Sequence, residues 1–573
     1  MTSLTRAEGT PVAAADLAGN DEARAEAALI AAAGNILRQE NREVPADFIA
    51  GLFERAVPED LMRYAARELA ELAADAWALI SVRKRGTANI RFNSPEGTGN
   101  HPRLKTVSVL EIVNDDMPFL LDSVLGELNE RGIEAFLVLH PVFTVKRDAA
   151  GRLVAFKGTQ AVDGALRESF IHLHVSRIDS EKQRAEIVAA LEQVLRDVRG
   201  CVADWRAMLG RVRETIAELK RQPPPLSVTE IAEAVDFLQW LVANNFTFLG
   251  IRDYAFTDGG RLLEPVFESG LGVLRSRDMP VVRRWNEPLV ITPEIRALLR
   301  EPSLLIVTKA AVRSRVHRRV HMDYVGVKRF DANGKPIGEL RIVGLFTSTA
   351  YTSSTRAIPY LRGKVDYVLS RAGFDLDGHS GKALVNVLET YPRDELFQID
   401  QDTLYQFALA VLQLDERPRV RVLPRRDRFD RFVSVLVYVP RERYDSKARE
   451  KIGDHLARAY NGRVSAFRPF FPEGPLVRVH FIIGRLEGEA PDPERTSLER
   501  AVEAIVRTWT DTLADELARV HEAARACPVP ALPHGVLARL LRDLFARRRG
   551  RGHPRHREPV AEPPARRRFS PPR

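Results

Sequence analysis

Cysteine is nearly absent from this 573-residue chain, which contains only Cys201 and Cys527. Two cysteines so far apart cannot build a disulfide framework, and this low usage fits a reducing cytoplasm. No run of about 18 apolar residues occurs, so we expect no membrane span and no membrane partner. The first 20 residues also lack the apolar segment that a secretory signal requires. The length predicts several domains. Together, these absences predict a cytoplasmic protein.

The positive charge of the chain belongs entirely to its C-terminal tail. Residues 524–573 contain 13 Arg, no Lys and three acids, a net charge of +10, whereas the whole chain carries +9 and the other 523 residues therefore carry −1. Two interpretations of this tail remain open. It is either a basic arm that binds nucleic-acid phosphates or the product of a shifted reading frame near Ala523. The second is favoured, because Arg, Pro, Ala and Gly are what GC-rich DNA encodes out of frame, and we expect no nucleic-acid partner.

Nucleotide-binding fingerprints are also absent from the sequence. No G-x-G-x-x-G opens a strand–helix unit, because the glycines at 270 and 272 lack a third one at the required spacing. No G-x-x-x-x-G-K-[ST] phosphate loop occurs either. We therefore assign no catalytic and no cofactor-binding residue to this chain.

Candidate metal ligands fail on their context. His317 and His321 are four residues apart, but the valines around them indicate a strand, and no carboxylate or Cys nearby completes a zinc set. His172 and His174 share one face of a predicted strand and receive the same structural interpretation. Asp375 and Asp377 begin a calcium-like loop whose later ligands are missing. We predict no metal site.

Element patterns divide the chain into six segments and predict an α+β fold class. They are residues 1–20, disordered; 21–83, a helical lead-in; 84–220, an α/β domain; 227–425, a mixed α/β domain; 426–522, a second α/β domain ending in a long helix; and 523–573, a disordered tail. The order strand–helix–strand–strand–helix in 84–220 predicts a ferredoxin-like sandwich with helices on one face of an antiparallel sheet. The same order recurs between about residues 430 and 520, which indicates an internal repeat.

The turn after the first strong strand is one candidate ligand site. Asn114, Asp115 and Asp116 follow the β-branched run 105–113, with Asp116 predicted as a helix N-cap and Pro118 in the first turn. Free backbone N–H groups at such a helix start can bind a small anion or zwitterion. The alternative is a plain capping turn.

A polar segment in the middle domain is the second candidate. Seven Ser and Thr residues between positions 347 and 355, Thr352 among them, surround Tyr351, and Arg356 follows. A polar, cationic loop of this kind can hold a carboxylate or a phosphate. The alternative is a loop that packs against another domain.

Several long motifs carry a resemblance to a known family. VLEIVNDDMPFLLDSVLGELNERGI resembles an ACT domain, in which a first strand leads into a D-x-P-x-L-L helix start. The same stretch, with four others, resembles the bacterial large-form NAD-dependent glutamate dehydrogenase over about residues 25–520. The other four are VGLFTSTAYTSSTRAIPYLRGKVDYVLSRAGFD, SGKALVNVLETYPRDELFQID, MDYVGVKRFD and FVSVLVYVPRERYDS.

The resemblance implies a specific organisation. Two ACT-type domains would flank a PAS-like middle domain, and the dehydrogenase domain, with its catalytic Lys and its bound NAD, would lie downstream. The family oxidises L-glutamate to 2-oxoglutarate, but no catalytic position carries over, so a truncated and inactive chain is implied. ACT domains bind amino acids and pair, which implies an amino-acid effector and a homo-oligomer. The alternative is a stand-alone ACT-type sensor, and the sequence fixes neither the effector, its sign nor the oligomer size.

Overall fold

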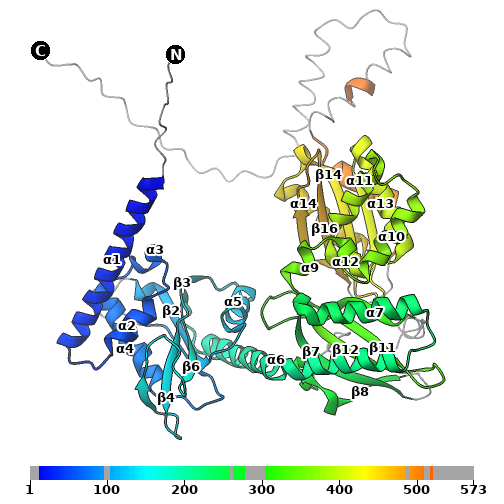
Figure 1. Cartoon of the computed structure of the whole chain (residues 1–573). Coiled ribbons are helices and arrows are strands. Elements are labelled where there is room, and N and C mark those ends of the chain that lie inside the picture. Colours follow the sequence, from blue (N-terminus) through cyan, green and yellow to red (C-terminus); the bar gives the residue numbers. More distant parts are fainter. Residues whose placement is uncertain are drawn as a thin grey trace, which may run out of the picture.

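The computed structural model describes residues 12–95, 103–257, 262–277, 303–485, 491–508, 511 and 516–519, with side chains from residue 24 onward (Figure 1). The first helix, α1, already begins at Val12 and runs to Gln39. Part of the N-terminus predicted to be disordered is therefore helical, in keeping with its many alanines, the strongest helix formers. The predictions for residues 1–11 and for the tail 523–573 lie outside the described residues. Within the described part, no helix is long and apolar enough to cross a bilayer.

The first unit is built on a six-stranded antiparallel sheet of order β1-β2-β6-β4-β5, with β3 also pairing with β6. Its strands are β1 (Asn89–Asn93), β2 (Val107–Asp115), β3 (Ala135–Leu139), β4 (Val142–Arg147), β5 (Leu153–Phe156) and β6 (Leu166–Ser176). Strands β3 and β4 are separated at His140-Pro141, because proline cannot donate a ladder hydrogen bond.

Helices cover both faces of this sheet, whereas the sequence predicted them on one face only. Phe170 on β6 packs with the lead-in helices α1, α2 (Ala46–Phe53), α3 (Pro58–Leu61) and α4 (Ala66–Ile80). Ile171 and Leu173 point the other way, toward α5 (Leu120–Glu130) and α6 (Glu181–Arg221). The predicted alternation along β6 is therefore present, but both of its faces are buried. The lead-in is part of this unit.

Helix α6 joins the first unit to the middle unit, and Figure 1 shows it running from one to the other. Ser180 caps its start by accepting a hydrogen bond from Gln183 N at 3.3 Å. Ile187 and Leu191 pack on the first sheet, whereas Met208 and Val212 belong to the core of the middle unit. The helix ends at Arg221, directly before three consecutive prolines at positions 223–225.

The middle unit is a six-stranded antiparallel sheet of order β10-β11-β12-β7-β8, with β9 pairing with β7. The helix before it is α7 (Val228–Trp240), and its strands are β7 (Phe246–Thr257), β8 (Leu262–Pro265), β9 (Leu271–Gly272), β10 (Leu305–Arg313), β11 (His321–Phe330) and β12 (Pro336–Phe346). Residues 331–335 form the turn that connects β11 to β12. One sheet face packs on α7 and the C-terminal half of α6, and the other on the N-terminal half of α6 and the first unit.

The last unit has four antiparallel strands in the order β13-β14-β16-β15. It comprises β13 (Arg421–Arg426), β14 (Phe432–Pro440), α14 (Ser446–Ala459), β15 (Gly462–Phe470), β16 (Leu476–Arg485) and α15 (Arg495–Ile505). The long helix predicted at the end of this segment is interrupted: α15 ends at Ile505, residues 506–508 are not helical, and residues 511 and 516–519 are again helical.

The helices predicted to complete the middle domain also cover the last sheet. They are α9 (Ser348–Thr352), α10 (Leu361–Ala372), α11 (His379–Glu389), α12 (Arg393–Gln398) and α13 (Gln401–Glu416). Leu423 and Leu436 of the last sheet share one core with these helices, while Val435 and Val437 face α14 and α15. Figure 1 shows α10, α11 and α13 beside β14 and β16.

The predicted repeat is a repeat of topology. In the last unit the chain runs β14, α14, β15, β16, α15, and β16 lies between β14 and β15. In the first unit it runs β2, α5, β3, β4, β5, β6, α6, and β6 lies between β2 and the broken strand β3–β4. Each unit also carries an edge strand, β1 or β13, that precedes the repeat in sequence, and the first unit has β5 at its other edge.

Candidate functional site

The turn between β2 and α5 contains the first predicted site. Asn114 is buried, and its side-chain oxygen accepts a hydrogen bond from Arg199 Nη2 on α6 at 2.5 Å. Asp115 is partly exposed, whereas Asp116 is exposed and its backbone N donates to Arg167 O at 3.1 Å. The three predicted residues thus lie together at one turn, each in a different environment.

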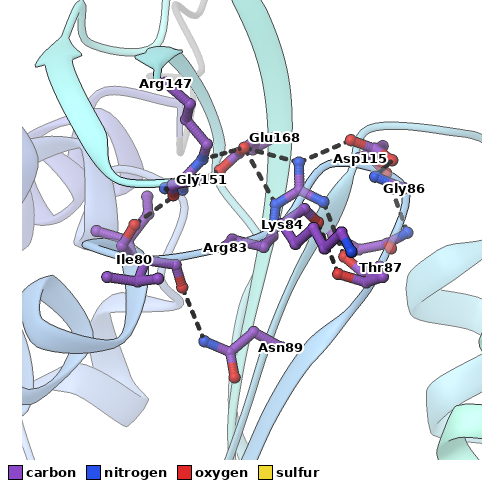
Figure 2. A network of polar contacts seen from close by, with 12 residues as sticks. Ile80, Arg83, Lys84, Gly86, Thr87, Asn89, Asp115, Arg147, Gly151 and Glu168 are labelled. Atoms are coloured by element: carbon purple, nitrogen blue, oxygen red, sulfur yellow. Dashed lines mark hydrogen bonds and ion pairs between the residues drawn. The ribbon is translucent and has the colours of Figure 1, made fainter. Parts of the chain in front are cut away.

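Figure 2 shows what holds Asp115 in place. The side chain of Arg83 is fully buried, and its Nη2 atom donates to Asp115 Oδ1 and to Glu168 Oε1, each at 2.7 Å. Arg147 Nη2 donates to Glu168 Oε2 at 2.7 Å, and Gly86 N donates to Asp115 Oδ2 at 3.2 Å. Burial alone would lower the pKa of Arg83, but the hydrogen bonds with Glu168 and Asp115 raise it. This ion network fixes the end of β2.

Helix α5 starts later than the sequence predicts. The N-cap is Phe119 instead of Asp116, and the first helical residue is Leu120. Pro118 disfavours a helical conformation in the residue before it, and Phe119 then turns the chain with a φ of 74°. No side chain caps this helix start. Pro118 and Phe119 form the turn that leads into the helix.

A loop of the middle unit contacts the same turn. His317 lies in the connection between β10 and β11, with a φ of 65°. Its backbone N donates to Ser123 Oγ at 2.9 Å, its Nδ1 lies 3.0 Å from Asp122 Oδ2, and its ring centroid lies 5.0 Å from that of Phe119. His321 begins β11, and its Nδ1 lies 3.1 Å from Ala310 O. The two histidines thus have separate partners.

The other histidine pair belongs to a buried hydrogen-bonded chain in the first unit. Tyr64 Oη lies 2.6 Å from His174 Nδ1, the two Nε2 atoms of His174 and His172 lie 3.0 Å apart, and His172 Nδ1 lies 3.1 Å from Glu111 Oε1. Burial, followed by the charge of His172, lowers the pKa of His174. These contacts agree with the structural role predicted for both residues. Among the described residues, no three His, Cys, Asp or Glu side chains gather as a metal site would require.

The Ser/Thr segment of the second candidate site binds a carboxylate of the protein itself. Ser354 Oγ donates to Glu389 Oε1 at 2.6 Å, and Thr355 donates to the same carboxylate through its backbone N at 2.9 Å and its hydroxyl at 3.0 Å. Burial would raise the pKa of Glu389, but these hydrogen bonds lower it. Glu389 on α11 therefore occupies the place that an anionic ligand of this loop would take.

The three residues proposed within that segment have different surroundings. Tyr351 Oη donates to Asp394 Oδ1 at 2.7 Å, and burial, then the charge of Asp394, raises the pKa of this tyrosine. Thr352 Oγ1 donates to Ser348 O at 3.2 Å, within its own helix. Arg356 is exposed. The structure thus joins Tyr351 to a buried charged cluster and leaves the other two outside it.

That buried cluster, centred on Asp394 of α12, was not predicted from the sequence. Lys309 Nζ lies 2.6 Å from Asp323 Oδ1 and 2.9 Å from Asp394 Oδ1. Arg468 Nη1 on β15 donates to Asp394 Oδ2 at 2.6 Å. Burial would raise the pKa of Asp394, but Lys309 and Arg468 lower it well below its usual range. One carboxylate thereby joins the middle sheet, the helices and the last sheet.

Comparisons with known proteins agree with this architecture. Residues 48–191 match the family model "Glutamate dehydrogenase, ACT1 domain", residues 358–417 match "Glutamate dehydrogenase, helical motif 1", and residues 421–510 match "Glutamate dehydrogenase, ACT2 domain". The chain carries two ACT domains and a helical motif of the glutamate dehydrogenase family.

Relatives of the chain carry one name. The chain is 36% identical over 474 residues to the NAD-specific glutamate dehydrogenase of Halomonas elongata. The aligned region covers 82% of this chain and 29% of that protein. It is 36% identical over 458 residues to the protein of the same name from Pseudomonas aeruginosa, covering 79% of this chain and 28% of that protein. The Mycobacterium tuberculosis protein of that name is 29% identical over 438 residues. The chain thus spans less than a third of the length of these relatives.

Helical motif 1 corresponds to helices α10–α13, and a buried lysine fixes its centre. Lys364 Nζ donates to three backbone oxygens at the end of α12, those of Leu396, Phe397 and Ile399, at distances of 2.7–3.0 Å. Burial, followed by the charge of Arg428, lowers the pKa of Lys364 to about 7. The glutamate dehydrogenase helical motif is therefore held in shape by a buried lysine that donates to backbone carbonyls at the end of α12.

The described residues do not fit NAD. Dinucleotides lie at the carboxyl ends of parallel strands linked by β–α–β crossovers, whereas every strand pair described in the two ACT domains and the middle unit is antiparallel. The glutamate dehydrogenase resemblance therefore assigns no NAD contact to these residues.

Proposed function

We propose that this chain is the regulatory and assembly region of an NAD-dependent glutamate dehydrogenase whose dehydrogenase domain lies outside it. The observation that carries the proposal is the β2–α5 turn of the first ACT domain. There the ion network of Arg83 fixes Asp115, while the exposed Asp116 lies just before a helix start that no side chain caps. A carboxylate group of an amino acid would accept from backbone N–H groups in the first turn of α5, and Asp116 would accept from its ammonium group.

The middle unit supports the finer architecture of this proposal. Its antiparallel sheet, with α7 against one face, has the mixed α/β character of a PAS-like domain. The two ACT domains flank it, and we propose that the edges of their sheets also contribute to a homo-oligomer. The chain itself would be inactive.

Enzymatic activity is the first test. We expect the purified chain to form no NADH from L-glutamate and NAD above the background of buffer. Clear turnover that depends on both substrates would contradict the proposal, because it would place an active site within this chain.

Isothermal titration calorimetry with L-glutamate and other amino acids tests the effector site. Asp116→Ala should weaken any binding, because Asp116 is exposed and supports no ion network. Asp402→Ala, an equally exposed acid on α13, is the matched control. No heat with any amino acid would contradict the effector site.

The second candidate function is a stand-alone ACT-type amino-acid sensor. It shares the β2–α5 turn and is favoured by the fact that ACT modules account for most of the matched residues. The genomic DNA beyond codon 523 separates the two. A frame that continues into a dehydrogenase domain supports the regulatory region, and an early stop in every frame supports the separate sensor.

A further inference from the structure

We propose that the connection between β10 and β11, residues 314–320, couples the middle unit to the β2–α5 turn of the first ACT domain. Two non-glycine residues with left-handed backbones meet there, Phe119 with a φ of 74° and His317 with a φ of 65°. Their rings lie 5.0 Å apart with an interplanar angle of 39°. Side chains with a Cβ atom rarely adopt this conformation, and it persists where the surroundings hold it. Here each of the two residues is part of the surroundings of the other.

A single hydroxyl group links the two backbones. His317 N donates to Ser123 Oγ at 2.9 Å, and Ser123 Oγ donates to Phe119 O at 2.5 Å. Ser123 is 1% exposed, so water does not replace either partner. A rotation of the Phe119 peptide moves the acceptor of this hydroxyl, and the hydroxyl in turn moves the acceptor of His317 N. The two left-handed residues therefore change conformation together.

Ion pairs extend the contact along α5. Arg319 pairs with Glu127 and, at 2.8 Å, with Glu130. A Cβ atom added to Gly126 would lie 3.5 Å from Arg319 Cγ, so this arginine lies flat on the helix. The loop thus contacts the C-terminal half of α5 in addition to its N-terminus.

The strands that carry this loop lead directly to the Asp394 cluster. Lys309 lies on β10 and Asp323 on β11, and Lys309 reaches Asp394 of helical motif 1. The paired strands β10 and β11 therefore connect the β2–α5 turn to the Asp394 cluster, which contacts Arg468 of the second ACT domain. As the route by which an amino acid at the turn would act, this coupling rests on the proposed function. The coupling itself needs no ligand.

A double-mutant cycle in the full chain tests the coupling. Phe119→Ala, His317→Ala and the double variant are compared by amide hydrogen exchange, read separately in residues 116–124 and 314–321, because exchange reports local opening. Each single variant should speed exchange in the partner segment about threefold or more. Coupling between two sites is reciprocal. Exchange in the double variant should therefore be only slightly faster than exchange in either single variant. Phe374→Ala and His379→Ala, both at exposed positions of helical motif 1, are the matched controls.

Two outcomes overturn the proposal. In one, each variant changes exchange only in its own segment, and in the other the effects of the two variants simply add. Ser123→Ala guards against a variant that fails to fold, because it removes only the shared hydroxyl and should speed exchange in both segments. Since no ligand takes part, a chain that binds no amino acid would contradict the proposed effector site and leave this result unchanged.

Discussion

Asp394 accepts a hydrogen bond from Arg468 at 2.6 Å across the boundary between helical motif 1 and the second ACT domain. The carboxylate is 8% exposed, whereas the arginine side chain reaches solvent. The other oxygen of Asp394 binds Lys309 of the middle unit, so removal of this one carboxylate leaves a buried ammonium group short of a partner.

Asp394→Asn should therefore destabilise the folded chain by about 3 kcal/mol, the usual cost of removing one partner from a buried ion pair. Urea denaturation followed by circular dichroism measures the change. Asp402→Asn, in the exposed pair with Arg371, is the matched control and should have little effect. Equal losses of stability in the two variants would show that the burial of Asp394 contributes nothing to the stability of the chain.

Arg83→Met should also cost about 3 kcal/mol, because Glu168 would keep only Arg147 while Asp115 would lose its main partner. Arg152→Met, whose side chain is 73% exposed and pairs with Asp148, serves as the control. Thermal unfolding of both variants is the measurement. A melting temperature of the Arg83 variant equal to that of the control would argue against the network as a structural element.

Acid should destabilise the folded chain through His480 on β16. Burial lowers the pKa of His480 to about 4, so the folded state favours the neutral ring, and Ser434 Oγ lies 2.8 Å from its Nε2. The unfolded chain takes up the proton near pH 6.5. The stabilisation is therefore fully present above that pH and is lost as the pH falls toward 4, by about 3 kcal/mol in all.

Urea midpoints between pH 4 and pH 8 at constant salt check this expectation. His480→Gln should flatten the dependence, whereas His379→Gln, at an exposed position, should leave it unchanged. A slope that His480→Gln does not alter would assign acid sensitivity to other groups, of which His321, with its pKa lowered by burial to about 4, is the first to examine.

Alkaline pH should stabilise the chain through Lys364. The pKa of this buried lysine is about 7 in the folded state and about 10.4 in an unfolded chain. Between these values the unfolded state binds more protons, so stability rises as the pH increases from about 7 to 10. Lys364→Met should remove that rise, as measured by urea denaturation at pH 7 and pH 9. A rise in stability of the same size in the variant would contradict this role of Lys364.

The sequence predicted the central strands well, because patterns of β-branched and aromatic residues are local. It missed β13, which is short and contains Pro424 and several arginines, and the helix start at Leu120, which depends on a left-handed Phe119. It placed α10–α13 in the middle domain, since nothing in their periodicity says which sheet an apolar face will cover.

The candidate site was predicted in part. The sequence pointed to Asn114–Asp116 through the order of strand and turn, but not to Arg83. In the stretch Arg-Lys-Arg-Gly this residue looks like part of a solvated basic loop, and only the tertiary fold buries it between two carboxylates. Likewise, no local pattern reveals that Glu389 occupies the Ser/Thr loop, because the two segments are more than 30 residues apart.

The 41 residues of α6 have a consequence for how the chain can be divided. At 1.5 Å per residue the helix is about 60 Å long, and it contributes to the cores of both the first ACT domain and the middle unit. A cut anywhere near its centre strips apolar surface from both halves. Fragments designed at the family-model boundary near residue 191 should therefore aggregate, and the smallest separable piece that includes the first ACT domain extends through the middle sheet.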